Sequence, residues 1–169
     1  LSASRVQIRR YTFDRESFER TRDSEVVILD LEADRSPRWH NITSMGFEPG
    51  GAMWALVGDK GLFEPAQDET NILGTLIRIV PSRVEGTGGY TIPEDAAAYS
   101  GSADPAVHSI GIRSPWKGVY YGGRWFFGDV GLDDVEEVNV IEAPGQNFGW
   151  PVVEGLCDDD VLGNDPDCA

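Results

Sequence analysis

The sequence of 169 residues is poor in basic residues and in long apolar runs, and both shortages exclude classes of protein. It has 14 Lys and Arg against 29 Asp and Glu, which gives a formal net charge of −15. Because nucleic acids and anionic membrane surfaces attract cationic proteins, we expect neither as a partner. No apolar run approaches the ~20 residues that cross a bilayer, so we expect no membrane span. The first residues lack the pattern of a secretory signal, as in a mature or excised chain.

Cysteine is also scarce. The two cysteines, Cys157 and Cys168, enclose a short polar segment at the end of the sequence. Their spacing is far wider than that of a redox or metal-binding Cys-x-x-Cys pair, so we expect a loop-closing disulfide and an oxidising compartment. Two free thiols in a cytosolic protein are the alternative. The enclosed segment carries five Asp and one Asn, which predicts either a calcium-binding loop or a solvated acidic loop.

Helical periodicity is nearly absent, and only residues 14–22 and 95–99 look briefly helical. Most apolar runs are short, rich in Val, Ile, Tyr, Phe and Trp, and bounded by Gly, Pro, Asp or Asn, which is typical of β-strands. We expect a surface loop over 85–104. The expected strands are 5–13, 25–31, 44–47, 52–57, 74–80, 118–121, 124–127, 137–142 and 149–153.

Two stretches of the sequence repeat the same order of features. Residues 45–59 and 119–129 each contain a strand, a glycine turn and an aromatic strand that ends in Gly-Asp. The strand pattern alone leaves a sandwich and a propeller open, and the repetition favours the propeller. Asp129 is expected to cap a turn by accepting backbone N–H bonds, and the same function is an alternative for Asp59. Four tryptophans, at 54, 116, 125 and 150, are expected to pack in the core.

Five segments in one order resemble the glucose/sorbosone dehydrogenase family of pyrroloquinoline quinone (PQQ) enzymes. They are residues 40–61, which contain His-Asn and Met-Gly-Phe-Glu-Pro-Gly, then 71–79, 111–116, 128–139 and 147–151. The resemblance implies an all-β fold made of antiparallel four-stranded blades of a six-bladed β-propeller. The whole chain, 1–169, would form part of one such domain, matching best over 40–156 and ending in the disulfide-closed acidic loop 157–168.

The resemblance also implies residue functions. His40 stands where the family has the general base, which takes a proton from a sugar hydroxyl while hydride passes to PQQ. Asp59 stands where a carboxylate orients and polarises that histidine. Arg113 would lie over the quinone and stabilise the charge that develops on its reduction. The catalytic residues are therefore expected to be His40, Asp59 and Arg113.

The cofactor contacts implied by the resemblance are His40, Arg113, Ser114 and Gly131. Ser114 departs from the family, which usually has Asn there. Gly131 falls where the backbone approaches a calcium ion beside the cofactor. Glu137 and the carbonyl of Phe148 fall where the family has a second, structural calcium, a cation that prefers oxygen ligands. We therefore expect PQQ and calcium as cofactors.

Together these features predict a periplasmic or extracellular oxidoreductase that acts on the CH–OH group of an aldose, sorbosone or polyol. A cytochrome or a quinone would accept the electrons. The chain is too short for six blades, so the rest of the propeller or another subunit is an expected partner, and this length alone is expected to be inactive. The alternative is a non-catalytic binding or structural module derived from a propeller, with a calcium-dependent function in a larger assembly.

Overall fold

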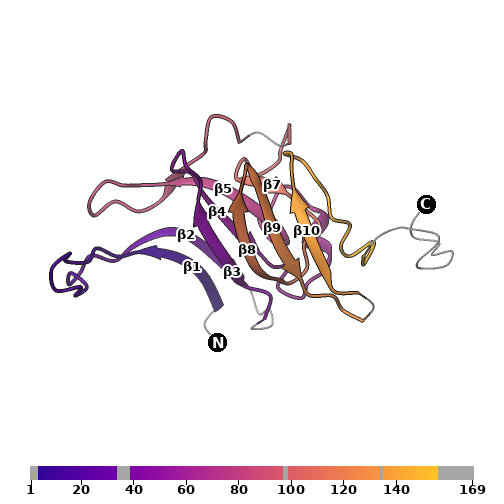
Figure 1. Ribbon diagram of the computed structural model, residues 1–169, viewed down its shortest axis with the longest axis horizontal. Helices are drawn as coiled ribbons and strands as arrows, with labels where there is room; N and C mark the ends of the chain where they lie inside the picture. Colours follow the sequence, from indigo (N-terminus) through magenta and orange to yellow (C-terminus); the bar gives the residue numbers. More distant parts are fainter. Residues whose placement is uncertain (1–3, 34–38, 97–98, 134, 156–169) are drawn as a thin grey trace.

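The structure is a computed structural model, and it describes residues 4–33, 39–96, 99–133 and 135–155. Strands dominate these residues, and the helical content is one short 3-10 helix (Figure 1). The elements are β1 (Ser4–Arg10), β2 (Val26–Ala33), β3 (Ile42–Phe47), β4 (Met53–Val57), the helix η1 (Glu64–Gln67), β5 (Thr75–Pro81), β6 (Tyr90–Thr91), β7 (Val107–Ser109), β8 (Pro115–Tyr121), β9 (Arg124–Asp129) and β10 (Glu137–Ile141).

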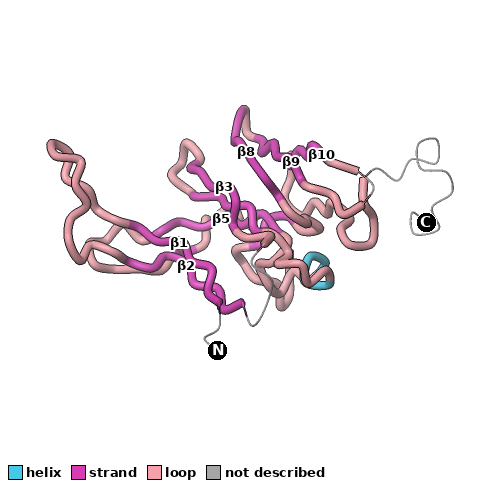
Figure 2. Tube along the Cα trace, turned by 90° about the horizontal axis from the view of Figure 1, so that it is seen from below, coloured by secondary structure: helices cyan, strands magenta, loops and turns pink. Residues whose placement is uncertain are grey.

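The strands form three sheets, and every pair of neighbouring strands is antiparallel. The first sheet is the hairpin β1–β2. The central sheet has the order β3-β4-β5, and the short strands β6 and β7 both pair with the far edge of β5. The third sheet has the order β10-β9-β8. Seen from below, the three sheets follow one another along the molecule (Figure 2).

Strand β4 lies between two hydrophobic clusters because both faces of the central sheet are covered. Successive side chains of a strand point to opposite faces. Met53, Ala55 and Val57 therefore pack in one cluster with residues of β1 and β2, including Ile8, Ile28 and Leu29. The alternate residues of β4 pack in a second cluster with the third sheet; this cluster comprises Trp54, Leu56, Leu76, Ile112, Trp125, Phe127 and Ile141.

Strands β3 and β8 are joined by side-chain hydrogen bonds as well as by packing. The Ser44 hydroxyl accepts a bond from the Gly118 amide at 3.1 Å and donates one to the Gly118 carbonyl at 3.2 Å. Gly118 leaves room for Leu56, because a Cβ at this position would lie 2.7 Å from a terminal methyl group of that side chain, which would have to shift. The two repeated stretches of the sequence thus fold into two equivalent hairpins, β3–β4 and β8–β9, as predicted.

The fold class is confirmed at the level of an all-β protein with antiparallel sheets. The finer prediction of uniform four-stranded blades is not met, because the sheets have two, five and three strands. The described strands do not close into a ring (Figures 1 and 2). Strands β6 and β7 were not predicted. Strand β6 lies inside the expected loop 85–104.

Three local predictions differ from the structure. Residues 14–22 form turns rather than a helix, because Phe18 has a φ of +57° and Phe13 pairs with Arg20 as an isolated β-bridge. Asp95 lies in a turn closed by a bond from the Ala96 amide to the Pro93 carbonyl, and the rest of the expected helix 95–99 includes positions outside the described residues. Residues 149–153 turn back on themselves instead of extending, since the amides of Val152 and Val153 bond to the Gly149 carbonyl. Both cysteines and the acidic segment 157–168 lie outside the described residues.

His108 on β7 is a buried titratable group and makes stability depend on pH. Its side chain is 2% exposed, and its ring lies 4.8 Å from the Trp125 ring. Burial, followed by the charge of Arg78, lowers the pKa of His108 from 6.5 to about 4. The unfolded chain therefore takes up this proton at a higher pH than the folded chain. We expect this group to reduce the free energy of unfolding by up to about 3 kcal/mol as pH falls from 6.5 to 4.

Urea unfolding of the wild type and His108→Gln at several pH values measures this contribution. The difference in stability between the two proteins should change across pH 6.5 to 4 and stay constant above pH 7. A difference that is the same at every pH would show that His108 is not held neutral by its surroundings.

Candidate active site

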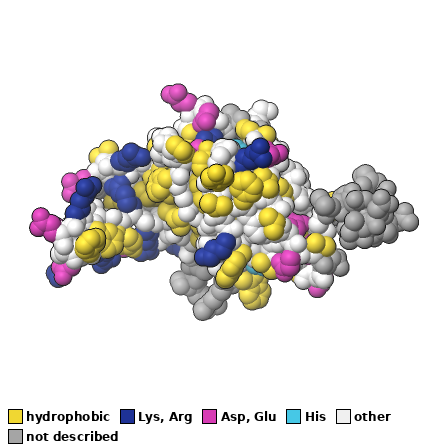
Figure 3. Space-filling view, viewed as in Figure 1, with side chains coloured by type: hydrophobic (Ala, Val, Ile, Leu, Met, Phe, Trp, Pro, Cys, Tyr) yellow, Lys and Arg dark blue, Asp and Glu magenta, His cyan; other side chains and the backbone are white. Residues whose placement is uncertain are grey.

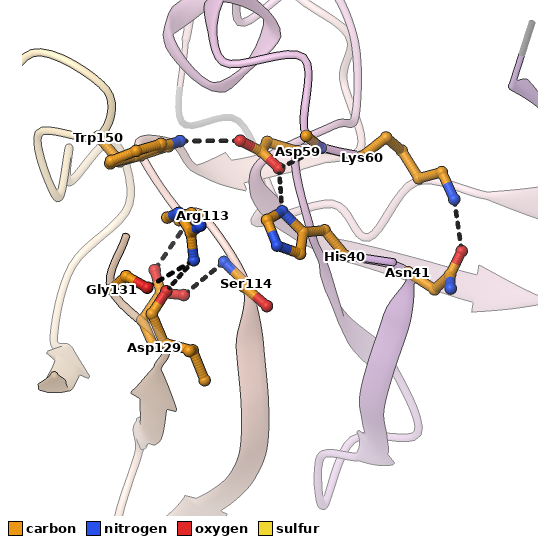
Figure 4. Close-up of polar contacts among 11 residues, drawn as sticks. His40, Asn41, Asp59, Lys60, Arg113, Ser114, Asp129, Gly131 and Trp150 are labelled. Carbon is orange, nitrogen blue, oxygen red and sulfur yellow. Dashed lines mark hydrogen bonds and ion pairs between the residues drawn. The ribbon is translucent and has the colours of Figure 1, made fainter. Parts of the chain in front are cut away.

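The predicted catalytic residues meet where β4 and β9 end (Figure 4). Each strand is followed or ended by Gly-Asp, at Asp59 and Asp129. The amide of Asp59 donates a 2.9 Å bond to the Arg113 carbonyl, so the two segments lie against each other. The repeated Gly-Asp of the sequence thus places two carboxylates at the same end of neighbouring sheets.

His40 and Asp59 form a close pair. The His40 Nδ1 atom lies 2.6 Å from Oδ1 of Asp59, and the side chains are 13% and 0% exposed. Gly58 permits this approach, because a Cβ there would lie 2.6 Å from the His40 carbonyl oxygen. The resemblance predicted both residues at one site, and the structure brings them into contact.

Asp59 accepts three hydrogen bonds, and these fix its charge. The donors are His40 Nδ1, the Gly61 amide at 2.7 Å and the Trp150 indole at 2.8 Å. Burial acts to raise the pKa of Asp59, but the bonds from these donors together outweigh it, so the pKa is below its ordinary value. The ionised carboxylate assigns the proton of His40 to Nδ1. Nε2 then carries a lone pair, the form that a general base needs.

Arg113 lies beside this pair and is held at several atoms. Its Nη1 donates to the carbonyls of Val130 and Gly131, each at 2.7 Å. Its guanidinium carbon lies 5.1 Å from the centre of the Trp150 ring, a cation–π distance. The Nε–H of Arg113 is buried and has no hydrogen-bond partner among the described residues. A buried donor without a partner is costly in a folded protein, and a bound group that accepts a hydrogen bond from this N–H would remove the cost.

Asp129 binds the backbone of the segment that bears Arg113. Its two carboxylate oxygens accept the amides of Arg113 at 2.8 Å and Ser114 at 2.6 Å, which confirms the predicted turn-capping function. Burial raises the pKa of Asp129 to about 7, although these amide bonds act to lower it. Ser114 is therefore part of the site through its backbone.

The residues predicted to bind metal fall in two places. The Gly131 carbonyl accepts a hydrogen bond from the Arg113 guanidinium. A calcium ion at that oxygen would therefore be repelled by the positive charge of Arg113. Glu137 and Phe148 line one cavity of about 490 Å³ together with Asn139. Glu137 accepts the Gly155 amide at 2.6 Å and the Asn139 amide at 2.8 Å, which leaves further lone pairs on the carboxylate. Within the described part of the chain, no three His, Cys, Asp or Glu side chains form a cluster suited to a metal.

Trp150 is the member of the site that sequence reasoning missed. It was expected in the core, and it is indeed buried, but its indole N–H and its ring also connect Asp59 to Arg113. Phe63 packs against its other side, with ring centres 5.4 Å apart. The signal was present, since Trp150 belongs to the last of the five segments that carried the resemblance.

The chain is similar to known proteins in sequence and in fold. Residues 2–160 match the family described as Glucose / Sorbosone dehydrogenase. Among solved structures, the chain is similar to the soluble aldose sugar dehydrogenase from Escherichia coli in its apo form, with 19% identity, a TM-score of 0.70, and coverage of 86% of this chain and 40% of that chain.

Two further structures are similar. The PQQ-bound form of aldose sugar dehydrogenase from Streptomyces coelicolor has 23% identity and a TM-score of 0.67, with 88% of this chain and 41% of that chain covered. A glucose dehydrogenase-type oxidoreductase from Thermus thermophilus has 29% identity and a TM-score of 0.62, with 83% and 39% covered. The chain thus spans about two fifths of the length of these proteins. In the described residues, no helix has the length and apolarity of a membrane span.

Proposed function

Because the chain belongs to the glucose/sorbosone dehydrogenase family, we propose that it supplies the proton-abstracting part of a PQQ-dependent sugar dehydrogenase. One observation carries the proposal: Trp150, Asp59 and His40 form a hydrogen-bonded series in which Asp59 holds Nδ1 of His40, so that Nε2 is the ring atom that can take a proton (Figure 4). This series is the arrangement that general-base catalysis requires. The family match does not favour the alternative of a non-catalytic module.

In the proposed reaction, the sugar loses a proton from a hydroxyl and a hydride from the carbon that bears it. His40 Nε2 takes the proton, and the C–O bond becomes a carbonyl. The negative charge of Asp59 stabilises the imidazolium that results, and its bond to Nδ1 holds the ring in one orientation. PQQ, when bound, supplies the acceptor of the hydride. Arg113 provides positive charge beside the site where negative charge develops.

The hydrogen-bonding state of Arg113 fits a cofactor of this kind. The Nε–H of Arg113 is a hydrogen-bond donor without a partner among the described residues, and the PQQ carbonyls and carboxylates are acceptors. We propose that Arg113, His40 and the backbone at Ser114 and Gly131 contact the cofactor. Further cationic groups for its carboxylates would come from strands that complete the domain.

An exposed apolar face supports the proposal that more strands follow. Val119, Tyr121 and Val138 lie on the side of the third sheet that faces away from the central sheet, and all three are exposed. Hydrophobic side chains gather in the middle of the face shown in Figure 3. Since the chain spans two fifths of the similar proteins, we propose that it is the central part of a propeller whose further blades cover this face. A periplasmic or extracellular location and an external electron acceptor complete the proposal.

We also propose a calcium ion in the cavity lined by Glu137 and the Phe148 carbonyl. Calorimetric titration of the chain should then show calcium uptake that Glu137→Gln weakens by about tenfold or more, because a neutral amide replaces a charged ligand. Glu85→Gln, an exposed carboxylate remote from the cavity in sequence, is the matched control and should bind as the wild type. Uptake that Glu137→Gln leaves unchanged would contradict this site.

The proposed activity is tested by loading the complete gene product with PQQ and calcium and measuring sugar-dependent reduction of a redox dye. We expect reduction with aldoses and none without sugar. Absence of reduction with every aldose and polyol offered would overturn the proposal.

A further inference from the structure

Lys60 is a buried cation that the proposed reaction does not use. The chain has two lysines, Lys60 and Lys117, and Lys117 is exposed whereas Lys60 is 2% exposed. The Lys60 ammonium donates a 2.6 Å bond to the Asn41 side-chain carbonyl, a neutral acceptor. Burial lowers the pKa of Lys60. No carboxylate among the described residues pairs with this ammonium, and removing a charge from water is costly without such a partner, so the position of Lys60 next to Asp59 needs an explanation.

Two adjacent residues of one segment, His40 and Asn41, bond to two adjacent residues of another, Asp59 and Lys60. His40 bonds to Asp59, and the next residue, Asn41, bonds to the next residue, Lys60; both bonds are 2.6 Å long. Figure 4 shows the two bonds on opposite sides of the same stretch of backbone. The Gly58 amide adds a 3.1 Å bond to the Asn41 carbonyl. We call the Asn41–Lys60 bond the brace, because it ties the segment that bears His40 to the turn that bears Asp59.

The backbone at both ends of the brace needs support. His40 has a φ of +51° and Lys60 a φ of +62°, the left-handed region that non-glycine residues rarely adopt. Such conformations cost about 1 to 3 kcal/mol each and persist when the surrounding structure over-determines them. If His40 relaxed to a negative φ, its ring would leave the Asp59 carboxylate.

The brace is well suited to resist that change. Lys60 and Asn41 line a small pocket whose other walls are mostly apolar, including Ile42, Val57 and Leu73. Water competes poorly for a hydrogen bond in such surroundings, and a charged donor makes a stronger bond than a neutral one. Losing the brace would remove the charged side-chain bond that lies next to the His40–Asp59 bond.

We propose that Lys60 is a positioning residue for His40: through Asn41 it holds the backbone conformation in which Nδ1 of His40 stays on Asp59 and Nε2 stays available as the base. The catalytic consequence rests on the proposed function, whereas the effect on the His40 ring does not. The two can therefore be tested separately.

The test replaces Lys60 with Met, which keeps the length of the side chain and removes its donors, and uses Lys117→Met as the control at the exposed lysine. Histidine ¹⁵N NMR of the chain reads the tautomer of His40, with His108 as an internal reference. We expect wild type and Lys117→Met to show a single tautomer protonated at Nδ1. Lys60→Met should keep the His108 signals and show mixed tautomers at His40. In the complete gene product, kcat should fall about tenfold or more with little change in KM, as expected when orientation of the base is lost.

The outcomes separate the two proposals. If Lys60→Met folds and its His40 signals are those of the wild type, the proposed positioning function of Lys60 is wrong. Mixed tautomers in a protein whose wild type oxidises no sugar support the brace and refute the proposed activity. If Lys60→Met does not fold, Lys60→Gln, which is neutral and too short to reach Asn41, replaces it. Failure of both to fold would overturn the proposal, since Lys60 would then be required by the fold as a whole.

Discussion

His40→Gln is expected to lower kcat for sugar oxidation by about 10²- to 10⁴-fold, the range that a positioned general base supplies. Glutamine is polar and of similar length, but its side chain cannot take up a proton at neutral pH. The ring of His40 is 13% exposed and bonds to buried Asp59, and the glutamine NH₂ group can replace Nδ1 as the donor, which should limit the loss of stability. Dye-linked steady-state kinetics of the PQQ-loaded complete gene product, with kcat and KM determined separately, measures the effect.

The matched control is His108→Gln, the same substitution at the other histidine of the sequence. His108 is buried between sheets and makes no contact with His40, so at neutral pH this variant should retain its kcat while it is folded. If His40→Gln retained wild-type kcat, the assignment of the base would be wrong.

Asp59→Asn is expected to reduce kcat almost as much as His40→Gln. The carboxylate accepts His40 Nδ1 with one oxygen and the Trp150 indole with the other. An amide has one acceptor oxygen and one NH₂ group, so it cannot accept both bonds, and its NH₂ group favours the wrong tautomer of His40. In a catalytic triad on another fold, the same Asp→Asn change reduces kcat about 10⁴-fold for this reason. The measurement is kcat together with the ¹⁵N shifts of His40.

The double variant gives the sharper comparison. If Asp59 acts through His40, then His40→Gln combined with Asp59→Asn should be no slower than the slower single variant. Asp23→Asn, at an exposed acid with a left-handed φ that Asn tolerates, controls for the loss of one negative charge. Fully additive losses in the double variant would show that Asp59 and His40 act independently.

The sequence was sufficient to predict most strands because their apolar runs are bounded by turn residues. Strand β4 is an example: five buried residues between a Gly-Gly turn and Gly58. It was insufficient for β6 and β7, which are two and three residues long and exist because β5 offers a free edge. Pairing of that kind depends on residues far apart in the chain. The helix expected over 14–22 is absent because Phe18 adopts a left-handed φ and the segment folds back through the Phe13–Arg20 bridge.

The candidate site shows the same division. The resemblance predicted His40, Asp59 and Arg113, and the structure brings them together. It gave no sign of the bond between Asp59 and Trp150, which are 91 residues apart, since an indole donor looks like any core tryptophan in a sequence. The left-handed φ of His40 and Lys60 was equally hidden, because neither residue type suggests it.

In the proposed function, His40 removes the proton of a sugar hydroxyl while hydride leaves the carbon that bears it. The most direct measurement is a single-turnover comparison of an aldose with its C1-deuterated form, in the complete gene product loaded with PQQ. The account predicts slower cofactor reduction with the deuterated sugar, and a further large reduction in rate for His40→Gln with either sugar. Equal single-turnover rates for the two sugars, or cofactor that no aldose reduces, would contradict it.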